Sequence, residues 1–132
     1  MKKKIAILGS TGSIGKTLIE IIKKDKKNFE VILLTAQKNE ISLLKQAKLL
    51  NVKNLIVTNA KSFQNAIKKK SNKKINIYND YLKFNKIFKG KVDYVMNSIS
   101  GIEGLKPTLE IIKHTKKIAV ANKESIICGW NL

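Results

Sequence analysis

The order of apolar and polar residues along this chain alternates between two patterns. Short apolar runs such as 4–8 and 29–36 predict buried strands, whereas segments such as 13–24 repeat apolar residues every three or four positions, as one helix face does. Asn39 is a favourable cap for the second helical segment. We therefore expect strands at 4–8, 29–36, 54–57, 75–78, 91–97 and 117–121, and helices at 13–24, 40–50, 61–70, 80–88 and 105–114, with another helix beginning at 125.

Regular alternation of strands and helices is typical of a parallel sheet that is covered by helices on both faces. We predict an α/β fold, a doubly wound and mostly parallel sheet of the Rossmann type, formed as one domain by residues 1–132. The apolar spacing also predicts which side chains the first two helices turn toward the core. These are Ile14, Leu18, Ile21 and Ile22 on the first helix, and Ile41, Leu44 and Ala47 on the second.

The final residues raise a question about domain organisation. Soon after the element that begins at Ser125, the chain contains Ile126, Ile127, Trp130 and Leu132 and then stops. Because a natural domain rarely ends on such an apolar run, we expect this chain to be the front part of a longer protein.

The formal net charge of +18 admits two interpretations. It is compatible with a nucleic-acid partner or with an anionic membrane surface. However, arginine is the residue best suited to binding bases and phosphates through paired hydrogen bonds. The chain contains no arginine, and all 27 of its basic residues are lysine. Together with abundant asparagine and isoleucine, this favours an AT-rich coding sequence with solvated lysines, so we expect no nucleic-acid partner.

Other features limit the cellular setting. The longest uncharged stretch, 5–15, is too short and too polar to cross a bilayer, so we expect no membrane partner. The opening MKKKIAIL imitates a secretion signal, but its apolar part ends after four residues and no cleavage site follows. With Cys128 as the single cysteine, a disulfide framework within one chain is impossible. We expect a cytoplasmic protein.

The stretch GSTGSIG, residues 9–15, lies directly between the first predicted strand and the first helix. Gly9 suits a sharp turn, Gly12 lets a pyrophosphate approach the backbone, and Gly15 allows the helix to pack closely on the sheet. The helix start offers free N–H groups, and Thr11 and Ser13 add hydroxyl donors. A tight turn without a ligand is the alternative, but the strand–turn–helix context favours a dinucleotide.

The residues after the second strand bear on which dinucleotide is bound. Sites for NAD usually place an acidic residue there, which holds the ribose 2′-hydroxyl. This chain has Gln37, Lys38 and Asn39 instead. A lysine attracts a 2′-phosphate that a carboxylate would repel, which favours NADPH, although Lys38 alone is also explained as one more surface lysine.

A second polar segment, Asn122-Lys123-Glu124-Ser125, follows the last predicted strand. Ligands of doubly wound sheets lie at the carboxyl ends of the strands, so these side chains are placed toward the crevice that holds the glycine turn. A polar loop in which Ser125 caps a helix explains the same residues equally well.

These motifs together resemble a known family. GSTGSIG at 9–15, ANKES at 121–125 and the segment 101–109 between them are similar to the N-terminal domain of 1-deoxy-D-xylulose 5-phosphate reductoisomerase, over essentially all of the chain. The resemblance implies a homodimeric, NADPH-dependent enzyme of non-mevalonate isoprenoid biosynthesis. It also implies a phosphorylated sugar substrate and a divalent metal, Mg or Mn, with 2-C-methyl-D-erythritol 4-phosphate as the product.

The resemblance also implies roles for individual residues. Thr11, Gly12, Ser13 and Ile14 contact the cofactor phosphates, Gln37, Lys38 and Asn39 surround the adenosine ribose phosphate, Asn122 and Glu124 line the nicotinamide side, and Lys123 reaches the substrate. Gln37 is a departure, because family members often have glycine there. The family's metal-binding carboxylates lie beyond the nicotinamide loop, so we expect no metal ligands, no catalytic residues and no turnover in this chain alone.

Two residues invite simpler explanations. His114 ends a predicted helix, where we expect it only to complement the helix dipole, and Cys128 is interpreted as a small buried apolar residue. The alternatives to the enzyme are a stand-alone NADP-binding module without catalysis and a basic nucleic-acid-binding domain.

Overall fold

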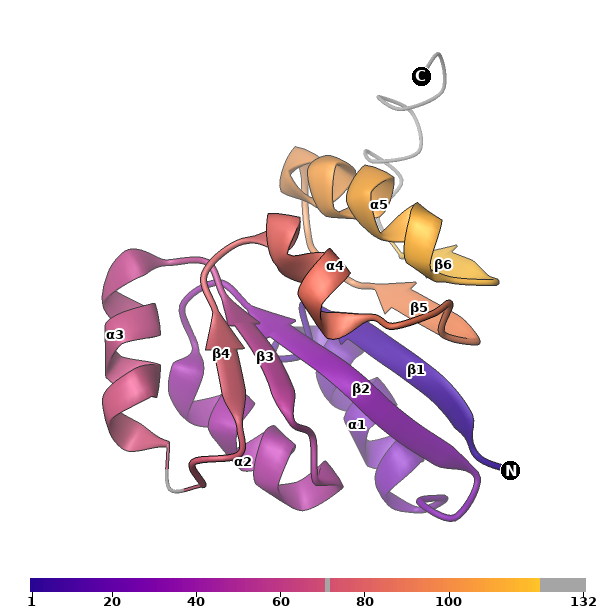
Figure 1. Ribbon diagram of the computed structural model, residues 1–132, viewed down its shortest axis with the longest axis horizontal. Coiled ribbons are helices and arrows are strands. Elements are labelled where there is room, and N and C mark those ends of the chain that lie inside the picture. Colours follow the sequence, from indigo (N-terminus) through magenta and orange to yellow (C-terminus); the bar gives the residue numbers. More distant parts are fainter. Residues whose placement is uncertain (71, 122–132) are drawn as a thin grey trace.

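The structure, a computed structural model, describes residues 1–70 and 72–121, and within these residues one parallel sheet of six strands forms the centre (Figure 1). The strand order is β4-β3-β2-β1-β5-β6. Successive strands progress outward from β1 to one edge, and the chain then returns to the other side of β1. The strands are β1 (Lys3–Leu8), β2 (Phe29–Ala36), β3 (Asn54–Val57), β4 (Asn76–Tyr78), β5 (Tyr94–Asn97) and β6 (Ile118–Val120).

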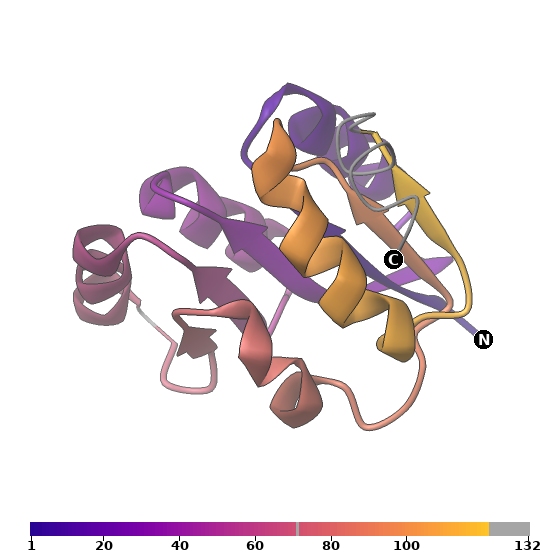
Figure 2. The same cartoon turned by 90° about the horizontal axis from the view of Figure 1, so that it is seen from above.

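Helices cover both faces of this sheet, as Figure 2 shows from above. One face carries α1 (Ser13–Lys23), α2 (Glu40–Leu50) and α3 (Ala60–Lys69), and the other carries α4 (Phe84–Ile87) and α5 (Leu105–Ile111). Short 3-10 turns occupy Tyr81–Lys83, Ile102–Gly104 and Ile112–His114, so the expected helices at 80–88 and 105–114 are each divided. The predicted doubly wound α/β fold is confirmed.

Each face of the sheet has its own hydrophobic core. Along β1, Ile5 and Ile7 pack under α1 and α2, whereas Ala6 and Leu8 pack toward α4 and α5. Because neighbouring strand residues point to opposite faces, a strand buried on both sides must be apolar throughout. This explains why the strands are continuous apolar runs in the sequence.

The predicted inward faces of the first two helices are wrong at three positions. Ile14, Ile21 and Ile41 are 47%, 56% and 52% exposed. Gly15 packs directly on the backbone of the glycine turn, and this contact sets the rotation of α1 about its axis. Positions four and seven residues later, Ile19 and Ile22, therefore meet the sheet.

Among the helices of the described residues, none combines the length and the apolar character that a membrane span requires.

The order of the strands creates a switch point. From β1 the chain continues through α1 to β2, and from β5 it continues through α5 to β6, on the opposite face. Crevices at such points, outside the carboxyl ends of the strands, are the usual ligand sites of doubly wound sheets.

Candidate nucleotide-binding site

The glycine turn lies at the carboxyl end of β1, at this switch point. Gly9 adopts φ +74°, and a Cβ there would lie 3.1 Å from the Ile99 backbone nitrogen. A Cβ at Gly15 would overlap the Gly9 carbonyl oxygen, so the close helix packing predicted for Gly15 is confirmed. A Cβ at Gly12 would meet nothing nearer than the Gly9 oxygen, 3.6 Å away. The fold itself requires Gly9 and Gly15, whereas Gly12 is exposed and an added Cβ there would have room.

The start of α1 is arranged to receive an anion. Its N-cap is Gly12, which has no side chain to satisfy the first N–H groups of the helix. Those groups and the positive end of the helix dipole are a ready site for phosphate. Ser13 and Ile14 are exposed in this first turn, while Thr11 is half-buried beside it.

The turn is held from both neighbouring strands by polar groups that sequence analysis did not single out. The Gly9 N–H donates to Thr35 Oγ1 over 3.0 Å, and the Ser10 N–H donates to the Thr35 carbonyl over 2.9 Å. From β5, the Ser98 hydroxyl donates to the Leu8 and Gly9 carbonyls. Thr35 and Ser98 each lie at the carboxyl end of an apolar strand. This position in the sequence is the feature by which they could have been predicted to contact the turn.

A cavity of about 490 Å³ opens beside the turn, at the carboxyl edge of the sheet. It brings together four of the predicted cofactor residues, Gly9, Thr11, Gly12 and Gln37. Its wall also contains residues that the sequence analysis missed. These are Ala36, Thr58, Tyr81, Ser98, Ile99, Ser100 and Glu103.

The segment expected to select the cofactor follows β2. Gln37, Lys38 and Asn39 are all exposed, and Asn39 is the N-cap of α2, with its Oδ1 accepting from the Ser42 N–H over 3.2 Å. The capping expectation is thus confirmed, and it leaves the Asn39 amide N–H groups as donors. The sequence neighbours of Lys38, Gln37 and Asn39, carry no carboxylate.

The next residue, Glu40, is a carboxylate close to where an NAD site would carry one. Its Oε1 accepts from Lys69 Nζ at 3.4 Å and from Asn65 of α3. A hydrogen bond from its own backbone N–H, assisted by Lys69, lowers the pKa of the Glu40 carboxyl, against the effect of burial. Glu40 therefore joins α2 to α3 and is not presented to a ribose.

The predicted nicotinamide-side and substrate residues, Asn122, Glu124 and Lys123, lie outside the described residues, as do Ser125 and Cys128. The structure reaches Ala121, whose N–H donates to the Asn97 carbonyl over 3.0 Å. In the part of the chain that is described, no three His, Cys, Asp or Glu side chains are grouped so as to hold a metal ion.

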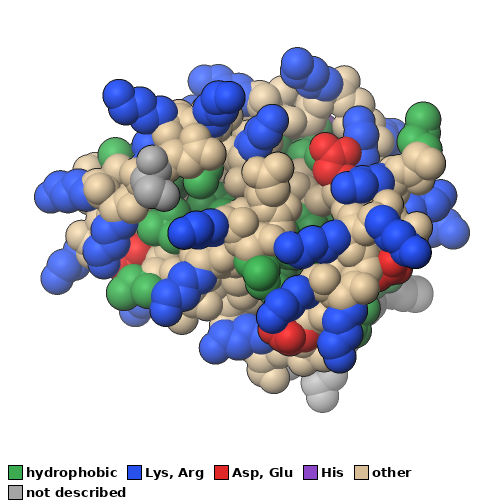
Figure 3. Space-filling model, turned by 90° about the horizontal axis from the view of Figure 1, so that it is seen from below, with side chains coloured by type: hydrophobic (Ala, Val, Ile, Leu, Met, Phe, Trp, Pro, Cys, Tyr) green, Lys and Arg blue, Asp and Glu red, His purple; other side chains and the backbone are tan. Residues whose placement is uncertain are grey.

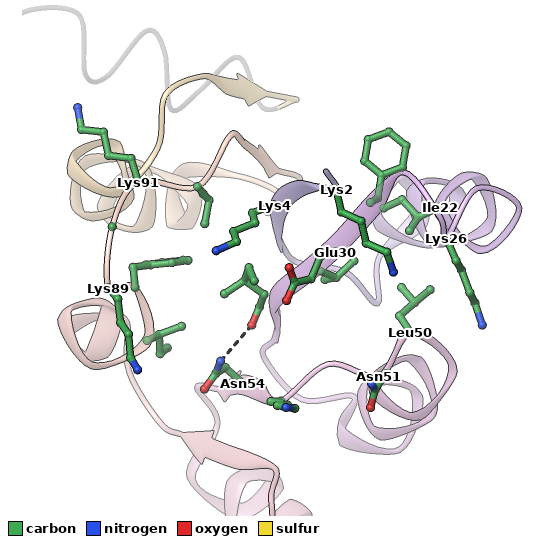
Figure 4. A pocket seen from close by; sticks show the side chains of 18 of the residues that line it. Lys2, Lys4, Ile22, Lys26, Glu30, Leu50, Asn51, Asn54, Lys89 and Lys91 are labelled. Carbon is green, nitrogen blue, oxygen red and sulfur yellow. Dashed lines mark hydrogen bonds between the residues drawn. The ribbon is translucent and has the colours of Figure 1, made fainter.

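A larger cavity, about 740 Å³, lies at the opposite, amino-terminal edge of the sheet and contains none of the predicted site residues. Six lysines contribute to its walls, yet Lys26, Lys89 and Lys91 extend away from its centre (Figure 4). Lysines also spread over the whole face seen in Figure 3 instead of gathering in one patch. This distribution supports the interpretation of solvated lysines.

His114 ends the 3-10 turn Ile112–His114, as expected for a residue at a helix end, and its effect on the helix dipole stays a prediction. Its ring stacks on Phe88, with centroids 5.4 Å apart, and meets the edge of Phe84. Burial, and then the charge of Lys113, lower the pKa of the His114 imidazole against the opposing effect of Glu110. The contact with the two phenylalanines favours the neutral ring, because burial disfavours the charged imidazolium.

Comparison with known proteins decides the family. The family model for 1-deoxy-D-xylulose 5-phosphate reductoisomerase matches residues 5–129. The chain belongs to this family. The reductoisomerase of Pelagibacter ubique is 60% identical over 98% of this chain, and that of Wolbachia pipientis wMel is 37% identical over 98%.

Solved reductoisomerase structures share the fold. The enzyme from Zymomonas mobilis in complex with NADPH superposes with a TM-score of 0.86 at 28% identity and covers 96% of this chain. A reductoisomerase in complex with NADPH, fosmidomycin and magnesium gives a TM-score of 0.84 at 27% identity, over 95% of this chain. This chain spans 34% of the Pelagibacter and Zymomonas proteins and 33% of the Wolbachia protein.

Proposed function

We propose that this chain is the NADPH-binding part of a reductoisomerase that converts 1-deoxy-D-xylulose 5-phosphate to 2-C-methyl-D-erythritol 4-phosphate. The observation that carries the proposal is the open backbone at Gly12, which leaves the start of α1 accessible beside the 490 Å³ cavity. Family membership and the NADPH named in two related structures support the choice of ligand.

In this proposal the residues around the turn bind and orient the cofactor, which supplies the hydride for the reduction. The N–H groups at Gly12, Ser13 and Ile14 and the hydroxyls of Thr11 and Ser13 hold the pyrophosphate. Gln37 borders the adenosine ribose, and Lys38 and the Asn39 amide hold its 2′-phosphate. Gly9 and Gly15 fix the turn, so that these donors are in place before the ligand arrives.

The remaining parts of the proposal concern groups beyond the described residues. Asn122 and Glu124 line the nicotinamide side, and Lys123 contacts the phosphorylated sugar. Residues outside those described here would hold a divalent metal, which would supply Lewis-acid chemistry for the substrate carbonyl. We further propose that the complete enzyme is a cytoplasmic homodimer.

A titration of the purified chain with NADPH and NADH tests the proposal. It is repeated at low and high salt with tripolyphosphate as a control, because a net charge of +18 attracts any polyphosphate. We expect NADPH to bind more tightly than NADH at both salt concentrations, without turnover when substrate and magnesium are added. Equal affinities for the two cofactors, or binding that high salt abolishes for every polyanion alike, would contradict the proposal.

A further inference from the structure

Tyr81 occupies a position in the nucleotide crevice that no sequence pattern indicated. It begins the 3-10 turn Tyr81–Lys83, which follows β4 at the far edge of the sheet, yet its side chain lines the same cavity as Gly9 and Gly12. Between β4 and α4 the chain crosses from the edge of the sheet toward its other face (Figure 1), and Tyr81 lies in this connection.

The ring is anchored on two sides. It packs against Phe84, with ring centroids 5.8 Å apart. Its hydroxyl interacts with the side chain of Thr35, a fully buried residue whose Oγ1 also accepts the Gly9 N–H. Tyr81 therefore lies next to a side chain that holds the glycine turn.

An uncharged phenol at Tyr81 suits its place in the wall of the cavity. Burial raises the pKa of the Tyr81 phenol, the Thr35 interaction opposes that rise, and the charge of Glu103 adds to it. The neutral phenol keeps its proton for hydrogen bonding and adds no negative charge to a crevice that must accept phosphates.

The position of the cavity indicates which part of a dinucleotide Tyr81 would meet. The glycine turn takes the pyrophosphate, and the segment after β2 takes the adenosine ribose, so the adenine must lie near these two. There the cavity walls include Ala36 and Gln37 after β2, Thr58 after β3, and Tyr81 and Ile99 from the other face. A flat purine is well matched to a slot with aromatic and aliphatic walls.

We propose that the ring of Tyr81 forms one wall of the adenine subsite and that Tyr81 is a specificity-determining contact for the adenine half of the cofactor. This inference rests on the proposed NADPH function. Base–aromatic stacking contributes about 1–3 kcal/mol per base, which corresponds to roughly 5- to 150-fold in affinity. Loss of the ring should therefore weaken only those ligands that contain the adenine.

The test compares three ligands on the complete chain: NADPH, adenosine 2′,5′-bisphosphate, which has no nicotinamide, and reduced nicotinamide mononucleotide, which has no adenine. Tyr81→Leu removes the aromatic face and keeps an apolar side chain, while Tyr81→Phe keeps the ring and removes the hydroxyl. Tyr94→Leu is the matched control, because Tyr94 is 39% exposed and does not line the cavity. Thermal unfolding confirms that each variant is folded.

We expect Tyr81→Leu to raise the Kd of NADPH and of adenosine 2′,5′-bisphosphate by the same factor, about 5-fold or more, and to leave reduced nicotinamide mononucleotide unchanged. Tyr81→Phe should stay within about threefold of the wild type, because the stacking face remains. Unchanged affinity for adenosine 2′,5′-bisphosphate in a folded Tyr81→Leu variant overturns the inference, as does equal weakening of all three ligands. If the wild-type chain fails to bind NADPH, the proposed function is what has failed.

Discussion

Ser10 and Gln46 are joined by reciprocal hydrogen bonds that connect the glycine turn to α2. Ser10 Oγ donates to Gln46 Oε1 over 2.7 Å, and Gln46 Nε2 donates to the Ser10 carbonyl over 2.9 Å. Ser10 is fully buried and Gln46 is 6% exposed. Because α2 also carries Asn39 at its start, this one contact fixes the spacing between the predicted pyrophosphate site and the predicted 2′-phosphate site.

Replacing Gln46 by leucine should therefore destabilise the fold and weaken cofactor binding. The change leaves the Ser10 carbonyl without its side-chain donor in a buried place, which costs about 1–3 kcal/mol in the free energy of unfolding. Urea unfolding measures this cost. Gln64→Leu, on the exposed side of α3, is the control and should change stability by less than about 0.5 kcal/mol. Equal stability of the two variants would show that the Ser10 contact contributes nothing.

The glycines of the turn should separate folding from binding. Gly15→Ala places a Cβ on the Gly9 carbonyl oxygen and the Ser10 backbone, so we expect a loss of at least about 1–3 kcal/mol in unfolding free energy. Gly12→Ala meets no atom closer than 3.6 Å. It should cost no more than about 1 kcal/mol of stability, as an alanine in an N-cap position does.

NADPH binding should be weakened more by Gly12→Ala than by Gly15→Ala, which is the reverse of their order in stability. At Gly12 the added methyl group occupies the approach of the pyrophosphate, so NADPH affinity should fall by about tenfold or more, which corresponds to at least ~1.4 kcal/mol. Calorimetric titration of the folded variant measures this loss. NADPH affinity equal to that of the wild type would place the pyrophosphate elsewhere.

Cofactor preference should depend on Lys38 in particular and not on lysine in general. We expect Lys38→Gln to weaken NADPH by roughly 3- to 10-fold and to leave NADH nearly unchanged, because only NADPH carries the 2′-phosphate. Lys48→Gln, in the last turn of α2, changes the net charge equally and serves as the control. A loss of NADPH affinity that is the same in both variants would assign the preference to overall charge.

Stability should decrease as the pH falls below the ordinary pKa of histidine, 6.5. The pKa of His114 is lowered in the folded protein, first by burial, so the unfolded chain binds more protons in the window just below that value. The stabilising contribution of the neutral ring is present above this window and is lost as protons bind. Thermal unfolding between pH 7.5 and pH 5.5, values about one unit on either side of 6.5, should show a falling Tm.

His114→Phe provides the control for this effect, since it keeps an aromatic ring against Phe84 and Phe88 and removes the titrating group. The sequence contains one histidine, so no other side chain has an ordinary pKa in this range. The variant should lose most of the slope of Tm against pH. An unchanged slope would mean that another group titrates.

Local sequence was sufficient to predict most of the elements. The strand Phe29–Ala36 and the helix end at Leu50 agree with the structure, since buried parallel strands are continuously apolar and Asn39 marks a helix start with a side-chain cap. The segment 80–88 was harder to predict. Its apolar residues fit a helix, but the structure divides it into a 3-10 turn and a short α-helix.

What the sequence by itself determined is the order of strands and helices and the chemistry of the glycine turn, because both depend on contacts between near neighbours along the chain. Only the tertiary structure decided which face of α1 is buried, since this follows from the contact of Gly15 with Gly9 and Ser10. It also decided that Gln46 holds the glycine turn through Ser10 and that Tyr81 lines the cavity beside that turn. Each lies more than 30 residues from Ser10 in the sequence, and long-range packing on opposite faces of the sheet brings both close to the glycine turn.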